Sequence, residues 1–413
     1  MTFADPSQVE KTVAAPAPAA AANVRDLRLD FFRGIAMFII LIAHTPGNFL
    51  TSWIPARWGF SDATEIFVFC SGMASAIAFG RGFDRVGWLL GSARVAFRVW
   101  QVYWAHVGLF FATLALTVAL TDSGYGTRNY WGQLNLWMIF VESEKWTNPN
   151  ILLSFMTLRW VPNYFDILPM YMVVLMLMPV IMALSNVNKW LVAAFIGTVW
   201  IFAQKQLWIN LGLPQFYIGL PAEPWGDRNW FFNPFGWQLI FFTGFAFMRG
   251  WLPKPPVNTV LIAVAAFIVL ANVPLSNIGV REFGFEWARE WRSDNKMLID
   301  KSSFGILRFV QFLALAYLCW VAAGDKGNRL LATGTGAIAR IWARCLAIIL
   351  KVGQQSLAVF VVSMFTARLM GFTMDVFGRD TGTVLLVNGL GACILIATAY
   401  GAGWFKSQPW RVK

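Results

Sequence analysis

Charged residues are scarce in this chain. Only 13% of its 413 residues are Asp, Glu, Lys or Arg, against roughly a quarter in an ordinary soluble domain. Hydrophobic residues make up 58% of the chain. Because so little charge cannot cover the surface of a soluble globular protein of this size, the composition excludes that class. It predicts an integral membrane protein.

Cysteine, histidine and repeated segments are also scarce. The chain has two histidines and four cysteines, and the cysteines form neither a CxxC pair nor a metal-ligand spacing. We therefore expect no disulfide and no metal ion. The glycine-rich stretches GDKGN and TGTG lack the strand, loop and helix order of a phosphate-binding loop. No segment repeats, and nothing in the sequence indicates a nucleic-acid partner or a particular oligomeric state.

Apolar runs of about twenty residues recur along the chain, each long enough to cross a hydrocarbon core of about 30 Å as a helix. Ten of them are found, at about 28–47, 62–80, 94–120, 166–185, 190–206, 236–250, 258–273, 305–323, 346–370 and 382–405. We predict an all-α polytopic membrane protein with about ten transmembrane helices. The Ala/Pro-rich segment 1–24 lacks the apolar core of a signal peptide and is expected to be a disordered cytoplasmic tail. Residues 25–413 then form a single membrane domain.

Basic residues give these spans an orientation. With the N-terminus in the cytoplasm, 19 of the 33 Lys and Arg residues lie on the cytoplasmic side, as the positive-inside rule requires. Most acidic residues fall outside, so the whole net charge of +12 is cytoplasmic. We predict that both termini are cytoplasmic. The basic side would attract anionic membrane lipid, or a cytoplasmic anionic ligand.

The first apolar run, LDFFRGIAMFIILIAHTPG, contains polar residues that lipid penalises. Arg33 and His44 are 11 residues apart, which places them about 16 Å apart along a helix and within about 20° of one face. Asp30 lies on the same face. An ion pair between Asp30 and Arg33 that reaches the interface would explain these two residues. It does not explain His44, which is therefore a candidate functional residue.

The longest connections fall on the outer side and are rich in aromatic and amide residues. One of them is QLWINLGLPQFYIGLPAEPWGDRNWFFNPF. A Trp at a membrane boundary usually serves as an anchor. Indole can also stack on the apolar face of a sugar ring while amides bind its hydroxyl groups, so these loops also suit a carbohydrate.

Three segments resemble a known family. Arg33, His44 and FVFCSGM at 67–73 resemble the membrane acyltransferase-3 superfamily, whose first span carries an Arg-to-His pair and whose second span ends in an FFxxSGF-like motif. DLRLDFFRGIAMFIILIAHTPGN and GFSDATEIFVFCSGM look like the OpgC family of succinyltransferases that decorate osmoregulated periplasmic glucans of Gram-negative bacteria. KVGQQSLAVFVVS resembles the family's penultimate span. Met73 departs from the superfamily pattern, which often has an aromatic residue there.

The resemblance implies an inner-membrane O-acyltransferase that moves a succinyl group from cytoplasmic succinyl-CoA to hydroxyls of a periplasmic glucan. Arg33, with Asp30 beside it, would hold a phosphate or the polar arm of the acyl-CoA, since a guanidinium offers planar bidentate donors. Ser71 would let the donor approach the backbone closely. Arg94 and Arg98, one helical turn apart at the cytoplasmic end of the third span, would meet the phosphates.

His44 is the predicted catalytic residue. Imidazole titrates near neutrality and can take the proton of an attacking hydroxyl, which is typically worth about 10²–10⁴ in rate. An acyl-imidazole intermediate is the competing mechanism. Asp62 and Glu65 open the second span on the same outer side, and either carboxylate would orient the imidazole. Asp62 would otherwise cap the helix.

Other interpretations stay open on the sequence alone. Arg94 and Arg98 would snorkel to the interface if they do not bind phosphate. Ser71 and Gly72 would serve helix packing, and His106 would line the same cavity or bond to a neighbouring helix. The reaction could be O-acetylation of another envelope polysaccharide. A membrane transporter is the alternative from a different class, although transporters commonly show internal repeats and paired broken helices.

Overall fold

The computed structural model describes residues 26–140 and 150–411. Within these ranges the chain folds into helices and connecting turns, and the only strand-like pairing is the single bridge between Pro221 and Asn229. The predicted all-α class is confirmed. The tail expected at 1–24 lies outside the described residues.

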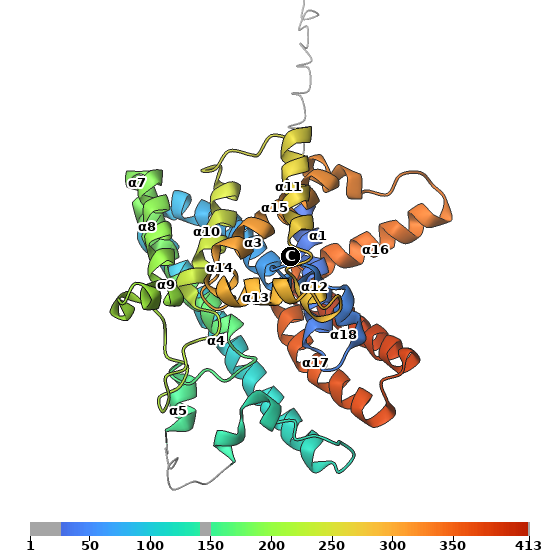
Figure 1. Ribbon diagram of the computed structural model, residues 1–413. Helices are drawn as coiled ribbons and strands as arrows, with labels where there is room; N and C mark the ends of the chain where they lie inside the picture. The colour runs from blue at the N-terminus through green and yellow to red at the C-terminus, as the bar shows by residue number, and fades with distance from the viewer. Residues whose placement is uncertain (1–25, 141–149, 412–413) are drawn as a thin grey trace, which may run out of the picture.

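Figure 1 shows how the helices are arranged around a common centre. The longer helices are α1 (Arg28–His44), α3 (Ala63–Ser75), α4 (Arg81–Asp122), α6 (Ile167–Met176), α7 (Met178–Val187), α8 (Lys189–Phe202), α10 (Pro234–Arg249), α11 (Thr259–Ala271), α15 (Ile306–Ala323), α16 (Ala337–Gln354), α17 (Ser356–Phe377) and α18 (Thr381–Ser407). Short helices in the connections are α2 (Pro55–Trp58), α5 (Ile151–Met156), α9 (Lys205–Asn210), α12 (Asn277–Arg281), α13 (Glu286–Asp294) and α14 (Lys296–Ile299).

Several helical segments are long and apolar enough to cross a membrane. Five such segments occur in the described residues: Ala63–Asp122, Ile167–Val187, Ile306–Ala323, Ser356–Phe377 and Thr381–Ser407. Shorter apolar helices run over Lys189–Phe202 and Thr259–Ala271. These segments support a membrane protein, and the count of about ten spans stays a prediction.

The second and third predicted spans, 62–80 and 94–120, lie on two helical parts that are joined at a kink at Gly87 rather than by a loop. A π-helical turn at Ala76–Gly80 joins α3 to α4. The chain then turns within α4 at Gly87, whose φ of +78° is a conformation that glycine adopts without strain. This turn brings Arg94 and Arg98 back beside Ser71.

The central helix α1 packs against α3, α16 and α17. Glycines set its distance from α16: a Cβ added at Gly34 would lie 2.1 Å from the carbonyl oxygen of Ile349, and one at Gly353 would lie 1.9 Å from that of Asp30. No side chain fits at either position. The two backbones are therefore in direct contact where α1 carries its polar residues.

Helices α3 and α10 cross in the same way. A Cβ at Gly72 would lie 1.9 Å from the carbonyl oxygen of Phe241, and one at Gly244 would lie 2.3 Å from that of Phe69. Gly72 of the FVFCSGM segment therefore serves helix packing, which was one of the two interpretations of that residue. The crossing fixes α3 while its opposite face, with Ser71, remains toward a cavity.

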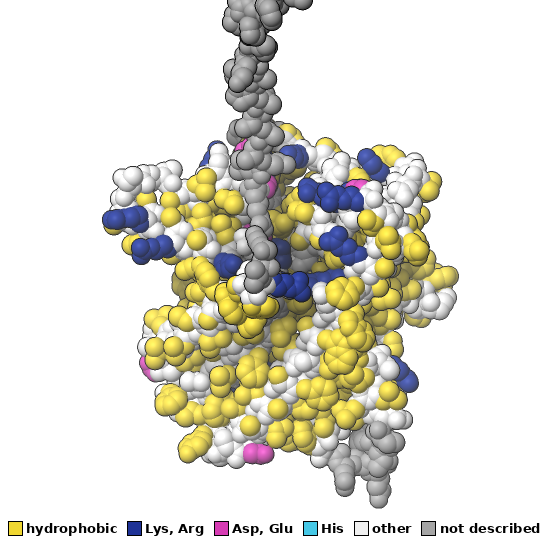
Figure 2. Space-filling view, turned by 180° about the vertical axis from the view of Figure 1, so that it is seen from behind, with side chains coloured by type: hydrophobic (Ala, Val, Ile, Leu, Met, Phe, Trp, Pro, Cys, Tyr) yellow, Lys and Arg dark blue, Asp and Glu magenta, His cyan; other side chains and the backbone are white. Residues whose placement is uncertain are grey.

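One face of the molecule has a basic region and an apolar region. Figure 2 shows Lys and Arg side chains gathered over its upper half, whereas hydrophobic side chains cover most of its lower half. An apolar belt beside a basic margin is the pattern expected of a membrane protein in contact with lipid and its headgroups.

Candidate active site

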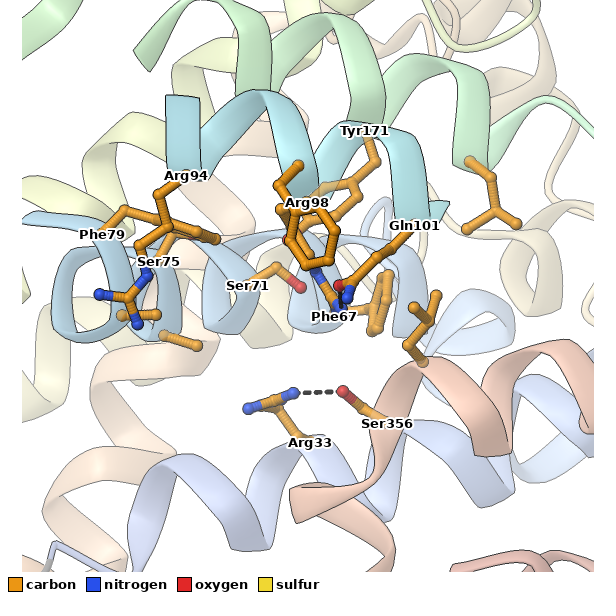
Figure 3. A pocket seen from close by; sticks show the side chains of 15 residues that line it. Arg33, Phe67, Ser71, Ser75, Phe79, Arg94, Arg98, Gln101, Tyr171 and Ser356 are labelled. Atoms are coloured by element: carbon orange, nitrogen blue, oxygen red, sulfur yellow. Dashed lines mark hydrogen bonds between the residues drawn. The ribbon is translucent and has the colours of Figure 1, made fainter. Parts of the chain in front are cut away.

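Two cavities lie along α1, α3, α6 and α17. The first, which we call the inner cavity, has a volume of about 320 Å³ and is shown in Figure 3. Its polar lining consists of Arg33, Ser71, Ser75, Arg94, Arg98, Gln101, Tyr171 and Ser356. The fold thus brings together Arg33, Ser71, Arg94 and Arg98, four of the five residues predicted to bind the donor. Asp30, the fifth, is buried in α1 and is not among the lining residues.

The inner cavity carries charge of one sign. Three guanidinium groups line it, and no Asp or Glu is among its described lining residues. Arg33 donates to the hydroxyl of Ser356, toward which it points in Figure 3, and Arg98 Nη1 donates to Oε1 of Gln101 at 3.0 Å. Both of these hydrogen-bond partners are neutral. This arrangement suits an anionic ligand.

The second cavity, which we call the outer cavity, has a volume of about 570 Å³. Its lining mixes polar groups with aromatic rings. The polar and charged residues are His44, Thr51, Arg57, Asp62, Thr64, Asn163, Asp166, Asn277 and Lys301, and the aromatic ones are Phe67, Tyr164, Phe231, Phe232 and Phe360. Rings beside amide, hydroxyl and carboxylate groups form a lining that a sugar can occupy.

His44 is the last residue of α1. The helix ends there because Pro46 cannot continue it and Gly47 takes a φ of +70°. The Nδ1 atom of His44 lies 2.9 Å from the carbonyl oxygen of Ile40. A carbonyl only accepts hydrogen bonds, so Nδ1 carries the proton of the neutral ring and the lone pair is on Nε2. Nε2 has no hydrogen-bond partner among the described residues, which suits a proton acceptor.

Asp62 and Glu65 have other roles than the one expected of them. They form the capping box of α3: Thr64 N donates to Asp62 Oδ1 at 2.7 Å, and Asp62 N donates to Glu65 Oε2 at 2.8 Å. Among the described residues neither carboxylate bonds to His44. The expectation that one of them orients the imidazole directly is therefore corrected, since the carbonyl of Ile40 does so. Asp62 still lines the outer cavity with His44.

Both carboxylates are also paired with distant cations. Asp62 accepts a hydrogen bond from Lys301, and Glu65 Oε1 accepts from Arg308 at 2.9 Å and 2.5 Å. The side chain of Glu65 is fully buried. Gln311, one turn after Arg308 on α15, accepts from the backbone N–H of Ser61 at 3.0 Å. Helix α15 therefore fixes the start of α3, and with it one wall of the outer cavity.

Tyr164 packs beside His44, and sequence reasoning missed it. Its ring meets the imidazole edge-on at a centroid distance of 5.6 Å, and its φ of +85° is a strained conformation for a residue other than glycine. Burial raises the pKa of the Tyr164 phenol, against the nearby charge of Arg368, so it stays protonated. It donates to the carbonyl oxygen of Met364 at 2.5 Å. These contacts hold the ring against His44.

Two other polar positions noted in the sequence, His106 and the segment KVGQQS, differ in their relation to the inner cavity. His106 is fully buried and stacks on Phe155 at a centroid distance of 5.0 Å, so it does not line the inner cavity as one interpretation had it. Within the late polar segment KVGQQS, Ser356 does line that cavity. No group of three or more His, Cys, Asp or Glu residues that could hold a metal occurs in the part of the chain that the structure describes.

Comparison with known proteins adds one finding. A family model described as OpgC protein matches residues 25–407. No curated protein and no solved structure matches the chain. The matched range spans both cavities and every helix that lines them.

Proposed function

The chain belongs to the OpgC family, and on that premise we propose that it is a transmembrane O-succinyltransferase that takes its acyl group from cytoplasmic succinyl-CoA. Membership in the family implies an acyltransferase for periplasmic glucans. What the proposal adds is the donor, the succinyl group, the side of the membrane from which each substrate comes, and the residues that act.

The observation that carries the proposal is the one-sided charge of the inner cavity. Arg33, Arg94 and Arg98 offer three guanidinium groups without a carboxylate in the lining, a set suited to the phosphate groups of an acyl-CoA. A volume of about 320 Å³ is at the low end of the roughly 300–1,000 Å³ of small-molecule sites. It suits the phosphates and part of the pantetheine arm, with the nucleotide outside.

Helix α1 then supplies the path for the arm. Arg33 lines the inner cavity and His44 lines the outer one, with about 16 Å of helical rise between them. A pantetheine arm anchored near Arg33 is of comparable length. It would place the thioester beside the imidazole.

At His44 the acyl group is transferred from the thioester of the donor to a hydroxyl of the glucan, which becomes an oxygen ester. A glucan hydroxyl gives its proton to Nε2 while its oxygen attacks the thioester carbonyl carbon, and the bond from carbon to sulfur breaks as the ester forms. The proton on Nε2 passes to the departing thiolate, which restores the imidazole. An acyl-imidazole route uses the same Nε2 lone pair as a nucleophile and remains the competing mechanism.

The outer cavity would hold the acceptor. Asn163, Asn277 and Thr64 offer hydrogen-bonding groups, and Phe231 and Phe232 offer ring faces, in a space of about 570 Å³. These are the groups that a neutral, hydroxyl-rich chain requires. In this proposal the outer cavity opens to the periplasm, both termini are cytoplasmic, and the protein lies in the bacterial inner membrane.

The test compares periplasmic glucans from cells that lack the protein, express it, or express His44→Gln at an equal level. Succinylation adds a carboxylate to the glucan and acetylation does not. We expect anionic, succinylated glucan only in cells with the unaltered protein. Acetylated neutral glucan would show that the donor is wrong. Glucan unchanged by the protein, together with no transfer from any acyl-CoA by extracted protein, would favour a transporter.

A further inference from the structure

Of the described side chains, one lines both cavities. On α3, Thr64 lines the outer cavity and Ser71 lines the inner one, whereas Phe67 between them lines both. On α17, Ser356 lines the inner cavity and Phe360, one turn later, lines the outer one. The level of Phe67 and Phe360 is therefore the boundary between the cavities.

Phe67 and Phe360 meet face to face at this boundary. Their ring centroids are 5.6 Å apart and their planes are inclined by 16°. Aromatic rings in contact have centroids roughly 4.5–7 Å apart, so nothing lies between these two rings. Both side chains are buried, with exposures of 5% and 2%. The two stacked rings therefore lie where the linings of the two cavities meet.

An acyl group that reaches His44 from a donor anchored near Arg33 has to cross this boundary. We propose that the Phe67–Phe360 pair is an aperture that selects the acyl donor by its cross-section. The inference rests on the proposed function. A linear arm can take the place of one ring when that ring rotates about χ1. A donor whose acyl group is itself a ring needs more width than one displaced ring leaves.

The aperture also separates water on the two sides of the membrane. With no donor present, two apolar rings in contact leave no polar group to which water in the boundary could bond. A continuous column of water would otherwise join the two cavities past His44, where it could hydrolyse the thioester. Selection and closure therefore follow from the same pair of side chains.

The first test measures acyl transfer by purified protein with succinyl-CoA and with benzoyl-CoA. We expect Phe67→Ala and Phe360→Ala each to raise the ratio of the benzoyl rate to the succinyl rate by at least about tenfold, the lower range for a change in the size of an apolar pocket. The matched control is Phe242→Ala, which truncates an equally buried ring on α10 that lines neither cavity. Its ratio should stay at that of the unaltered protein. A ratio in the two aperture variants equal to the control's would overturn the proposal.

A second test needs no catalysis. In a chain whose four native cysteines are replaced by serine, Ser71→Cys places a thiol in the inner cavity. In sealed vesicles, a small charged thiol reagent should label this cysteine from one side only, and from both sides when Phe67→Ala and Phe360→Ala are added. Labelling from both sides with the rings in place, or from one side without them, contradicts the aperture. If no acyl-CoA supports transfer, the proposed function fails while this labelling still reports on the aperture.

Discussion

The inner and outer cavities are lined by many of the same helices but differ in whether their basic side chains have acidic partners. Among the described residues, the inner cavity is lined by three arginines and by no acidic residue. In the outer cavity each cation is matched, since Lys301 pairs with Asp62 and Arg57 pairs with Glu282. The charged lining residues of the first region are therefore all basic, whereas the cations of the second are paired with carboxylates of the chain.

This difference separates two kinds of ligand. Positive charge held in a cavity without a carboxylate is costly until an anion arrives, which favours binding of a phosphate-bearing donor. Charges already paired contribute little net attraction for an ion but fix the walls of the cavity. A neutral polyhydroxyl acceptor needs fixed walls rather than free charge. The comparison therefore supports the proposal that the donor binds in the inner cavity and the acceptor in the outer one.

The largest expected effect comes from breaking the buried ion pair between Arg308 and Glu65, which fixes the start of α3 beside the outer cavity. Arg308→Met leaves the fully buried carboxylate of Glu65 without its cation. Removing one partner of a buried ion pair costs about 3–5 kcal/mol, so we expect loss of folded protein and of transfer. Thermal unfolding in detergent measures the first.

The matched control for this pair is the double variant Glu65→Gln with Arg308→Met, in which no charge is left unpaired. It should recover most of the stability, because a pair replaced as a unit is close to neutral. A double variant as unstable as Arg308→Met would show that the charge imbalance is not the cause.

A smaller effect on stability but a large one on rate is expected at His44. His44→Gln keeps a side chain that donates and accepts hydrogen bonds but cannot take up a proton at neutral pH. Transfer should fall by at least about 10², the lower end for loss of a general base. The assay uses membranes with equal amounts of each variant and added succinyl-CoA. Near-normal transfer would place the catalyst elsewhere.

The variant Arg33→Lys tests whether the inner cavity binds the donor rather than the glucan. Lysine keeps the charge but loses the planar, bidentate donor set, so the KM for succinyl-CoA should rise about tenfold. The KM for glucan should stay within about twofold, because Arg33 lines only the inner cavity. Steady-state kinetics with each substrate varied in turn gives both values. A raised glucan KM with an unchanged donor KM would reverse the assignment.

The smallest expected effect is that of Thr64→Val in the outer cavity. The substitution removes a hydroxyl without changing the shape of the side chain, and no hydrogen bond of that hydroxyl to another described residue is lost. One neutral hydrogen bond contributes about 0.5–1.5 kcal/mol, so the glucan KM should rise about two- to tenfold. The donor KM should not move, and a change confined to the donor would break the comparison.

The sequence predicted relations between residues that lie on the same helix. The spacing of Arg33 and His44 follows from helical periodicity, and both residues line cavities as one stripe of α1 requires. The capping box of Asp62 and Glu65 was readable because its two members are three residues apart. Arg94 and Arg33 were both expected to bind the donor because both were predicted to lie near the basic cytoplasmic side. In the structure the turn at Gly87 brings them to the same cavity.

Partners that are distant in sequence could not be predicted. Arg308 lies 243 positions from Glu65, and Lys301 lies 239 positions from Asp62. No periodicity relates residues on two different helices, so only the fold reveals these pairs. A buried carboxylate is usually paired with a cation, so the sequence could indicate that such a partner exists but not which residue it is. Because both carboxylates are used in these pairs, the direct bond expected between one of them and His44 does not form.

The central claim is that the inner cavity binds the donor, and equilibrium binding of CoA to purified protein tests it without any chemistry. The account predicts that Arg94→Gln with Arg98→Gln weakens CoA binding by at least about tenfold, since each charge-assisted hydrogen bond contributes roughly 1.5–3 kcal/mol. His44→Gln should stay within about twofold of the unaltered protein. Binding that is unaffected by the two arginine substitutions but lost in His44→Gln would contradict the account.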